Sequence, residues 1–98
     1  MPEPKKITAK KVIMMSEVLR ALGHPIRIAI IELLESNDEL TVSDIFTKLG
    51  IEQAIASQHL AIMKNKGILS CRRDGKNVWY SLKLKQLEHI VECMNKFE

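Results

Sequence analysis

The apolar residues of this chain change their spacing at Gly67, and this change restricts the possible folds more than any other feature. Over residues 53–66 they recur every three to four positions, as on one face of an amphipathic helix. Over residues 68–82 they alternate with polar residues, and Asp74-Gly75 lies inside that stretch. An Asp-Gly pair between two alternating runs is typical of a β-hairpin with a two-residue turn. The sequence therefore predicts a helix that leads directly into a hairpin.

The register of this hairpin follows from the position of its turn. With Asp74-Gly75 as the two turn residues, the apolar residues of both strands lie on one face of the hairpin. The opposite pairs predicted in this way are Arg73 with Lys76, Cys71 with Val78, and Leu69 with Tyr80.

Helical spacing also marks both ends of the chain. Residues 7–22 carry an apolar stripe that ends at Gly23, and a second helix begins at Pro25 with His24 as its cap. After the hairpin, a last helix is predicted from the heptad-like spacing of Leu84, Leu87, Val91 and Met94, flanked by Ile90 and Phe97.

A short third helix precedes the one that begins near Gln53. Thr41 and Asp44 have the spacing of a capping box, which marks its start, and Gly50 marks its end. Two helices joined by a tight turn that contains glycine form the helix-turn-helix pattern.

The length of 98 residues accommodates one domain, residues 1–98, with residues 1–6 as a flexible tail. The net charge of +3 is only a weak indication of an anionic partner. No apolar run reaches the roughly 18 residues of a membrane span, and two cysteines do not make a disulfide framework. We therefore expect a cytoplasmic domain without a membrane partner. Its fold is mostly α, a winged helix-turn-helix in the order α-α-α-α-β-β-α.

The fourth helix has an unusual exposed side. Its apolar stripe leaves a side with amide, hydroxyl and small residues and without any acid. Amides can pair with adenine, hydroxyls can contact bases or phosphates, and small apolar groups can meet a thymine methyl. These residues predict a DNA-recognition surface, with an ordinary solvated face as the alternative. They are Gln53, Ala54, Ser57, Gln58, Ala61 and Lys64.

The hairpin adds four residues that suit a DNA-contacting wing, namely Arg72, Arg73, Lys76 and Asn77. A basic hairpin tip beside a helix-turn-helix can contact phosphates or the minor groove. A charged, solvated turn is the alternative interpretation.

Taken in order, these segments resemble the ArsR/SmtB family of winged-helix repressors. The resemblance is carried by residues 21–27, 42–45, 57–63, 67–69, 72–76 and 80–82. It implies a homodimer that places its recognition helices in successive major grooves and represses genes until a small inducer arrives. The dimer would form through the first and last helices, with Val12, Met15, Leu19, Leu84, Leu87, Ile90, Val91 and Met94 at the interface.

The resemblance also assigns roles by position. Gln53, Ala54, Ser57, Gln58 and His59 match the recognition-helix stretch, and Ser43 matches a phosphate contact. His59 has a second interpretation, as a partly buried residue that orients the helix. For Arg27 we expect a structural ion pair, with Asp44 or another acid, in preference to a DNA contact.

The family's metal ligands are mostly missing. No cysteine lies at the start of the third helix, and Leu84 and Gln86 occupy the early ligand positions of the last helix. His89 and Cys93, one helical turn apart, are the remaining candidates for zinc. We therefore expect no metal and no other cofactor.

A thiol switch is a second open alternative. Redox-sensing relatives carry paired cysteines on the second and last helices, but Ile31 stands at the second-helix position here. Cys71 is expected on the core side of the hairpin, as a small hydrophobic residue. A switch between Cys71 and Cys93 stays open.

No enzyme motif is present, so the predicted function is that of a dimeric regulator that binds double-stranded DNA. The sequence does not identify its inducer. The alternative from another class is a winged-helix module that binds a protein partner without reading DNA.

Overall fold

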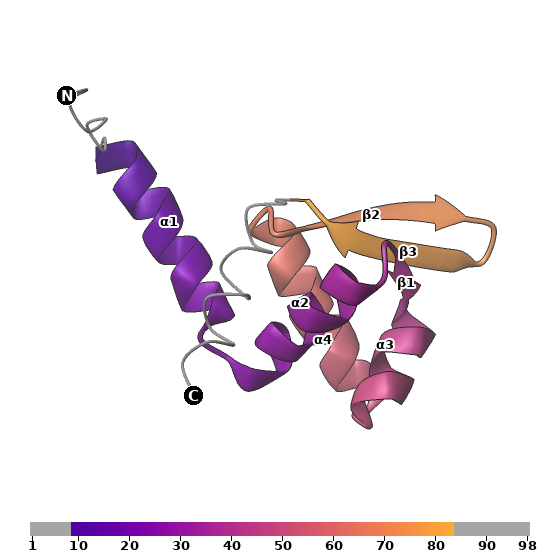
Figure 1. Cartoon of the computed structure of the whole chain (residues 1–98). Coiled ribbons are helices and arrows are strands. Elements are labelled where there is room, and N and C mark those ends of the chain that lie inside the picture. Colours follow the sequence, from indigo (N-terminus) through magenta and orange to yellow (C-terminus); the bar gives the residue numbers. More distant parts are fainter. Residues whose placement is uncertain (1–8, 84–98) are drawn as a thin grey trace.

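The computed structural model describes residues 9–83 of the chain (Figure 1). The predicted succession of four helices and a hairpin is confirmed, and one short strand is added. The predicted last helix lies outside the described residues. In chain order the elements are α1 (Ala9–Leu22), α2 (Pro25–Ser36), β1 (Leu40–Thr41), α3 (Val42–Leu49), α4 (Gln53–Asn65), β2 (Leu69–Asp74) and β3 (Asn77–Leu82).

Side-chain caps fix the starts of α2 and α3 as the sequence predicts. Nδ1 of His24 accepts from the backbone N–H of Ile26 at 3.2 Å, ahead of a proline in the first turn. The Thr41 hydroxyl accepts from the Asp44 N–H, and the Asp44 carboxylate accepts from the Thr41 N–H, both at 3.1 Å. Gly50 ends α3 with a φ of 65°, a backbone conformation that side chains disfavour. The tight turn into α4 therefore requires glycine at this position.

The three strands form one antiparallel sheet in the order β1-β3-β2. β1 was not predicted, because two residues are too few to show an alternating pattern. It forms through tertiary pairing of Leu40 with Tyr80 and of Thr41 with Trp79. This pairing attaches the start of α3 to the hairpin.

The predicted hairpin register is wrong by two residues. Asp74 pairs with Asn77 and Cys71 pairs with Tyr80, so the turn residues are Gly75 and Lys76. Gly75 has a φ of 63° at the first turn position. A type II′ turn needs a positive φ at this position, which favours glycine. The sequence predicts glycine at the second turn position instead. Because side chains alternate with a period of two, this shift leaves every residue on its predicted face.

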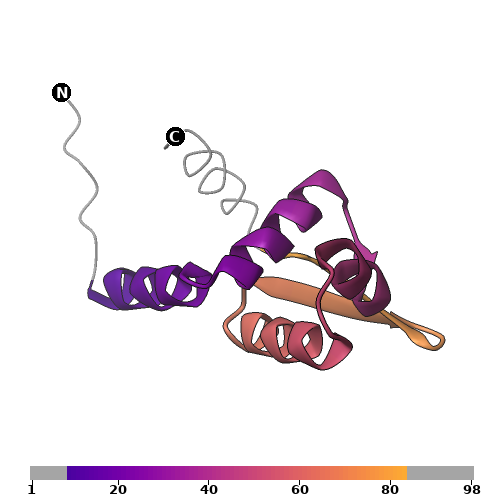
Figure 2. The same ribbon diagram turned by 90° about the horizontal axis from the view of Figure 1, so that it is seen from below.

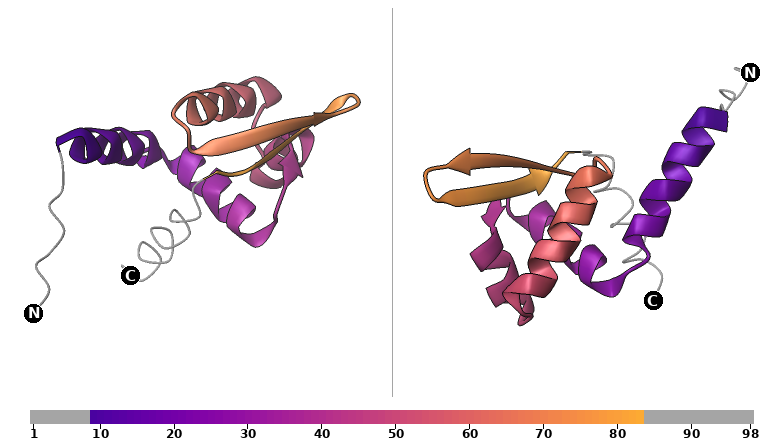
Figure 3. Two further views of the ribbon diagram at one scale, coloured as in Figure 1. Left: turned by 90° about the horizontal axis from the view of Figure 1, so that it is seen from above. Right: turned by 180° about the vertical axis from the view of Figure 1, so that it is seen from behind.

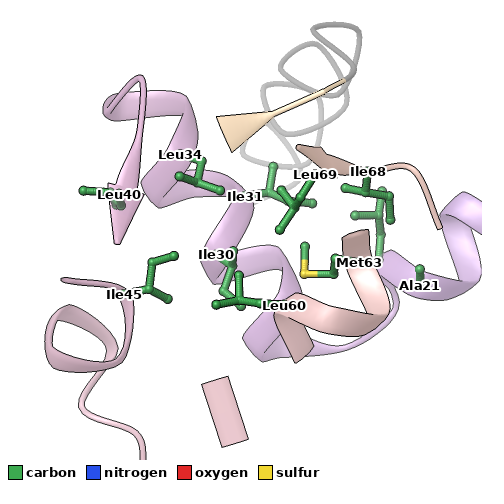
Figure 4. Packing of buried hydrophobic residues seen from close by; sticks show 11 residues of the cluster. Ala21, Ile30, Ile31, Leu34, Leu40, Ile45, Leu60, Met63, Ile68 and Leu69 are labelled. Carbon is green, nitrogen blue, oxygen red and sulfur yellow. The ribbon is translucent and has the colours of Figure 1, made fainter. Parts of the chain in front are cut away.

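The core lies between α2, α3, α4 and the base of the hairpin (Figure 4). The apolar stripe of α4 consists of Ala56, Leu60 and Met63, and all three side chains are fully buried. Ile30 and Ile31 of α2 pack against it and are fully buried too. This packing holds α4 by its apolar side and leaves the opposite side open.

α1 extends away from the other helices, and the far end of the hairpin extends beyond them on another side (Figures 1, 2 and 3). Among the α1 side chains that the structure describes, Ala21 and Leu22 join the core. Val12, Ile13 and Leu19 are 51%, 59% and 54% exposed. No helix within residues 9–83 is both long enough and apolar enough to cross a bilayer.

Candidate nucleic-acid interface

The predicted recognition surface of α4 is exposed along its length. None of its side chains belongs to the core, and all six point to the open side of the helix. They are Gln53, Ala54, Ser57, Gln58, Ala61 and Lys64. The packing of Leu60 and Met63 on the opposite side sets this orientation.

An open groove joins the start of α4, the start of α3 and the tip of the hairpin. It brings together the predicted contacts Ser43, Gln53, Ser57, Lys76 and Asn77 from three separate segments; its other lining residues are Thr41, Val42 and Val78. Both helices point their N-termini into this region, where backbone N–H groups and the helix dipole favour an anion. The arrangement suits a phosphate backbone that passes between the helices and the wing.

Arg72 lies at the root of the wing, the part of the hairpin beside which β1 pairs with β3, and not at the turn. Its Nε and Nη2 donate to the two carboxylate oxygens of Glu39, at 2.7 and 3.0 Å. Its guanidinium also lies 5.6 Å from the ring centre of Trp79. The hydrogen bond from Arg72 lowers the pKa of Glu39 below its usual range. Neither Glu39 nor Trp79 was singled out from the sequence, because their contacts depend on how β1 and the hairpin pair.

Arg73 and Lys76 are exposed near the hairpin turn. Among residues 9–83, neither forms an ion pair, whereas Arg72 also lies 3.7 Å from Asp74. The charges available to a phosphate at the wing tip are therefore those of Arg73 and Lys76.

His59 is partly buried on the side of α4 that faces α2. Its Nδ1 accepts from Nε of Arg27 at 3.1 Å, and its ring lies 4.5 Å from the ring of His24. Burial lowers the pKa of His59, and the nearby charges of His24 and Arg27 lower it further. His59 is thus partly buried and hydrogen-bonded within the protein, while its role, in DNA contact or in orienting the helix, stays a prediction.

The acidic partner predicted for Arg27 is not found among the described residues. Arg27 instead donates to His59 and, through Nη1, to the carbonyl oxygen of Ala21 at 3.2 Å. Asp44 was the wrong choice because its carboxylate caps α3. Arg27 is thus a structural residue, as expected, but with neutral partners.

The candidate metal and thiol residues are only partly described. His89 and Cys93 lie outside residues 9–83, and within that range no three potential ligands gather. Cys71 is half-buried opposite Tyr80, and Ile31 is fully buried. Burial raises the pKa of Tyr80 above its usual range.

One apolar residue of the exposed surface was missed. Ile55 on α4 is 38% exposed, beside Ala54. The sequence could have indicated this exposure, because Ile55 does not lie on the same helix face as Ala56 and Leu60.

Comparison with known proteins agrees with this geometry. Residues 24–70 match the family model of bacterial regulatory proteins of the arsR family. The transcriptional repressor PagR of Bacillus anthracis is 31% identical over 83 residues, which cover 85% of this chain and 83% of PagR. The chain belongs to the ArsR family. Its fold is therefore the winged helix-turn-helix of these transcriptional regulators.

Further relatives extend the similarity of this ArsR-family chain. The repressor SmtB of Mycobacterium tuberculosis is 40% identical over 76% of the chain and 55% of SmtB. Among solved structures, PagR superposes with a TM-score of 0.82 at 29% identity, covering 89% of this chain and 99% of PagR. HlyU of Vibrio cholerae gives 0.82 at 26% identity, covering 91% and 96%.

Proposed function

We propose that this ArsR-family regulator reads operator DNA with the exposed side of α4 and holds the flanking phosphates with α3 and the wing. The observation that carries the proposal is the groove that unites Ser43, Gln53, Ser57, Lys76 and Asn77. Within the part of the chain that the structure describes, the lining offers hydroxyl, amide and ammonium groups and includes no acid, which supports an anionic ligand in this groove.

The two kinds of contact divide between the elements. Gln53, Ser57 and Gln58 offer amide and hydroxyl groups to base edges, and Ala54 offers a methyl to thymine. Arg73 and Lys76 at the wing offer charge to phosphates of any sequence. Arg72 contributes less charge to DNA, since Glu39 already neutralises it.

The regulator is proposed to act as a homodimer. The side chains of Val12, Ile13 and Leu19 are exposed on α1, and an apolar row of this kind is normally covered by a partner. The winged-helix domain of Mb0332 from Mycobacterium bovis, which shares this fold, is described as homodimeric. Two-fold symmetry would then require an imperfect palindrome with half-sites one or more helical turns apart. The interface residues predicted beyond Lys83 would complete this surface.

The sign of regulation is open to experiment. PagR is named a repressor and HlyU of Vibrio cholerae a transcriptional activator. We propose repression by occlusion of a promoter, in the cytoplasm where operator DNA is found, and release by a signal yet to be identified.

Fluorescence anisotropy with the protein's own upstream DNA and a scrambled duplex, at two salt concentrations, tests the function. We expect dimer-stoichiometric binding that prefers the upstream DNA and weakens as salt rises. Equally weak binding to both duplexes, and to a library of genomic fragments, would contradict the proposal and favour a module that binds a protein partner.

A further inference from the structure

The side chain of Arg27 links three elements of the fold. Arg27 lies in the first turn of α2. Its Nη1 donates to the carbonyl oxygen of Ala21 near the end of α1, and its Nε donates to Nδ1 of His59 on α4. The ring of His24, which caps α2, lies 4.5 Å from the ring of His59. One guanidinium therefore ties α1, which is proposed to dimerise, to the proposed recognition helix.

We propose that Arg27, acting through neutral His59, is the positioning residue that fixes α4 relative to α1 and α2, and that protonation of His59 weakens sequence-specific DNA binding. This inference rests on the reading of DNA by α4 proposed above. It gives His59 a role without contact to DNA.

The hydrogen bond exists in only one protonation state of His59. An imidazole nitrogen accepts only when it carries no proton, so the neutral ring must hold its proton on Nε2. A second proton on Nδ1 would turn an N–H toward the Nε–H of Arg27, and both side chains would then be cations. The bond would be lost and replaced by repulsion.

The surrounding charges reinforce this effect. Arg27 and His24 face His59 from α2. Glu17 and Arg20 of α1, and Lys66 at the end of α4, line a pocket with Arg27. His59 does not line this pocket, and the charges that act on it are those of Arg27 and His24, so a proton on His59 adds charge beside groups of the same sign.

The direction in which DNA binding changes with pH distinguishes this role of His59 from a direct DNA contact. Without the bond to Arg27, α4 loses its hydrogen-bonded link to α1, and Gln58, the neighbour of His59, loses its defined position against the bases. Preference for the operator over scrambled DNA then falls as pH falls. A His59 that contacted a phosphate directly would have the opposite effect, because its positive charge would strengthen binding.

The hydrogen bond can be tested on the free protein by proton–nitrogen correlation NMR of the three histidine rings. We expect His59 to be the Nε2–H tautomer with a pKa below about 6.5, and the Arg27→Gln variant to raise that pKa. His59→Asn assigns the signals. The Nδ1–H tautomer, or a pKa unchanged in Arg27→Gln, would overturn the inference, whatever the protein does with DNA.

The coupling can be tested by anisotropy of the full chain on its operator and on scrambled DNA. The ratio of the two affinities removes the general effect of protein charge. Between about pH 7.5 and about pH 5.5 we expect this ratio to fall five- to tenfold, the equivalent of about one lost hydrogen bond.

His59→Asn keeps an acceptor near the position of Nδ1 but cannot be protonated. We expect its affinity ratio to be independent of pH, whatever its absolute value. His89→Gln is the matched control and should retain the wild-type pH dependence. A ratio that rises or stays constant in the wild type, or a fall that His59→Asn keeps or His89→Gln abolishes, would overturn the proposed coupling. Absence of any operator preference near pH 7.5 would refute the proposed function, while the NMR result on His59 would stand.

Discussion

The proposed recognition helix, α4, and the wing both carry predicted DNA contacts, but the fold holds them in different ways. α4 rests on a fully buried stripe and is tied to α2 through His59 and Arg27. The wing consists of two strands whose outer residues are exposed, and Arg72 at its root forms ion pairs with Glu39 and, at 3.7 Å, with Asp74. Base reading requires side chains held in one position, whereas attraction to phosphates tolerates movement. The difference suggests that α4 supplies specificity and the wing supplies affinity.

The largest expected effect comes from a substitution that removes a buried side chain on which α4 packs. Leu60→Ala deletes a fully buried side chain between α4 and α2, and should lower the free energy of unfolding by about 2–5 kcal/mol. Urea denaturation measures this loss. Thr47→Ala, an exposed position on α3, is the control and should change stability little. Equal stability of the two variants would mean that burial does not hold the recognition helix.

The next substitution separates recognition of the base sequence from general attraction to the phosphates. Gln53→Ala leaves the buried stripe intact but removes an amide from the groove. We expect it to reduce discrimination between operator and scrambled DNA by about 1–3 kcal/mol, with little change in affinity for scrambled DNA. Anisotropy with both duplexes measures the two quantities. An equal loss of affinity for both duplexes would mean that Gln53 contacts the DNA backbone, and would contradict the proposed division of roles between α4 and the wing.

The corresponding change in the wing is Lys76→Ala. Its ammonium group is exposed at the turn, so we expect weaker binding to every sequence and unchanged discrimination. The slope of log affinity against log salt should fall by about one for each phosphate contact removed. Arg73→Ala provides a second measurement of the same kind. A loss confined to the operator would show that the wing reads sequence.

The sequence could predict contacts between residues close in the chain, but not contacts between distant segments. Caps and stripes depend on residues a few positions apart, so the helices, the Thr41–Asp44 capping box and the buried side of α4 were all predicted. The two-residue strand β1 and the pairing of Arg72 with Glu39 join segments distant in the chain, and no local pattern marks them. The acid predicted for Arg27 was wrong for the same reason, since His59 is 32 residues away. For the hairpin, the alternation fixed the faces but not the register.

The smallest effect concerns the root of the wing, where Glu39 neutralises Arg72. Glu39→Gln keeps the shape of the side chain and removes its charge, which leaves Arg72 free to attract phosphate. The pair is exposed, so stability near neutral pH should change little. We expect affinity for scrambled DNA to rise and the salt slope to steepen by up to about one. The wild type should approach the variant as pH falls through the lowered pKa of Glu39, because protonation of this carboxylate also releases Arg72. An unchanged salt slope in Glu39→Gln would mean that Arg72 stabilises the wing by packing on Trp79 and does not contact DNA.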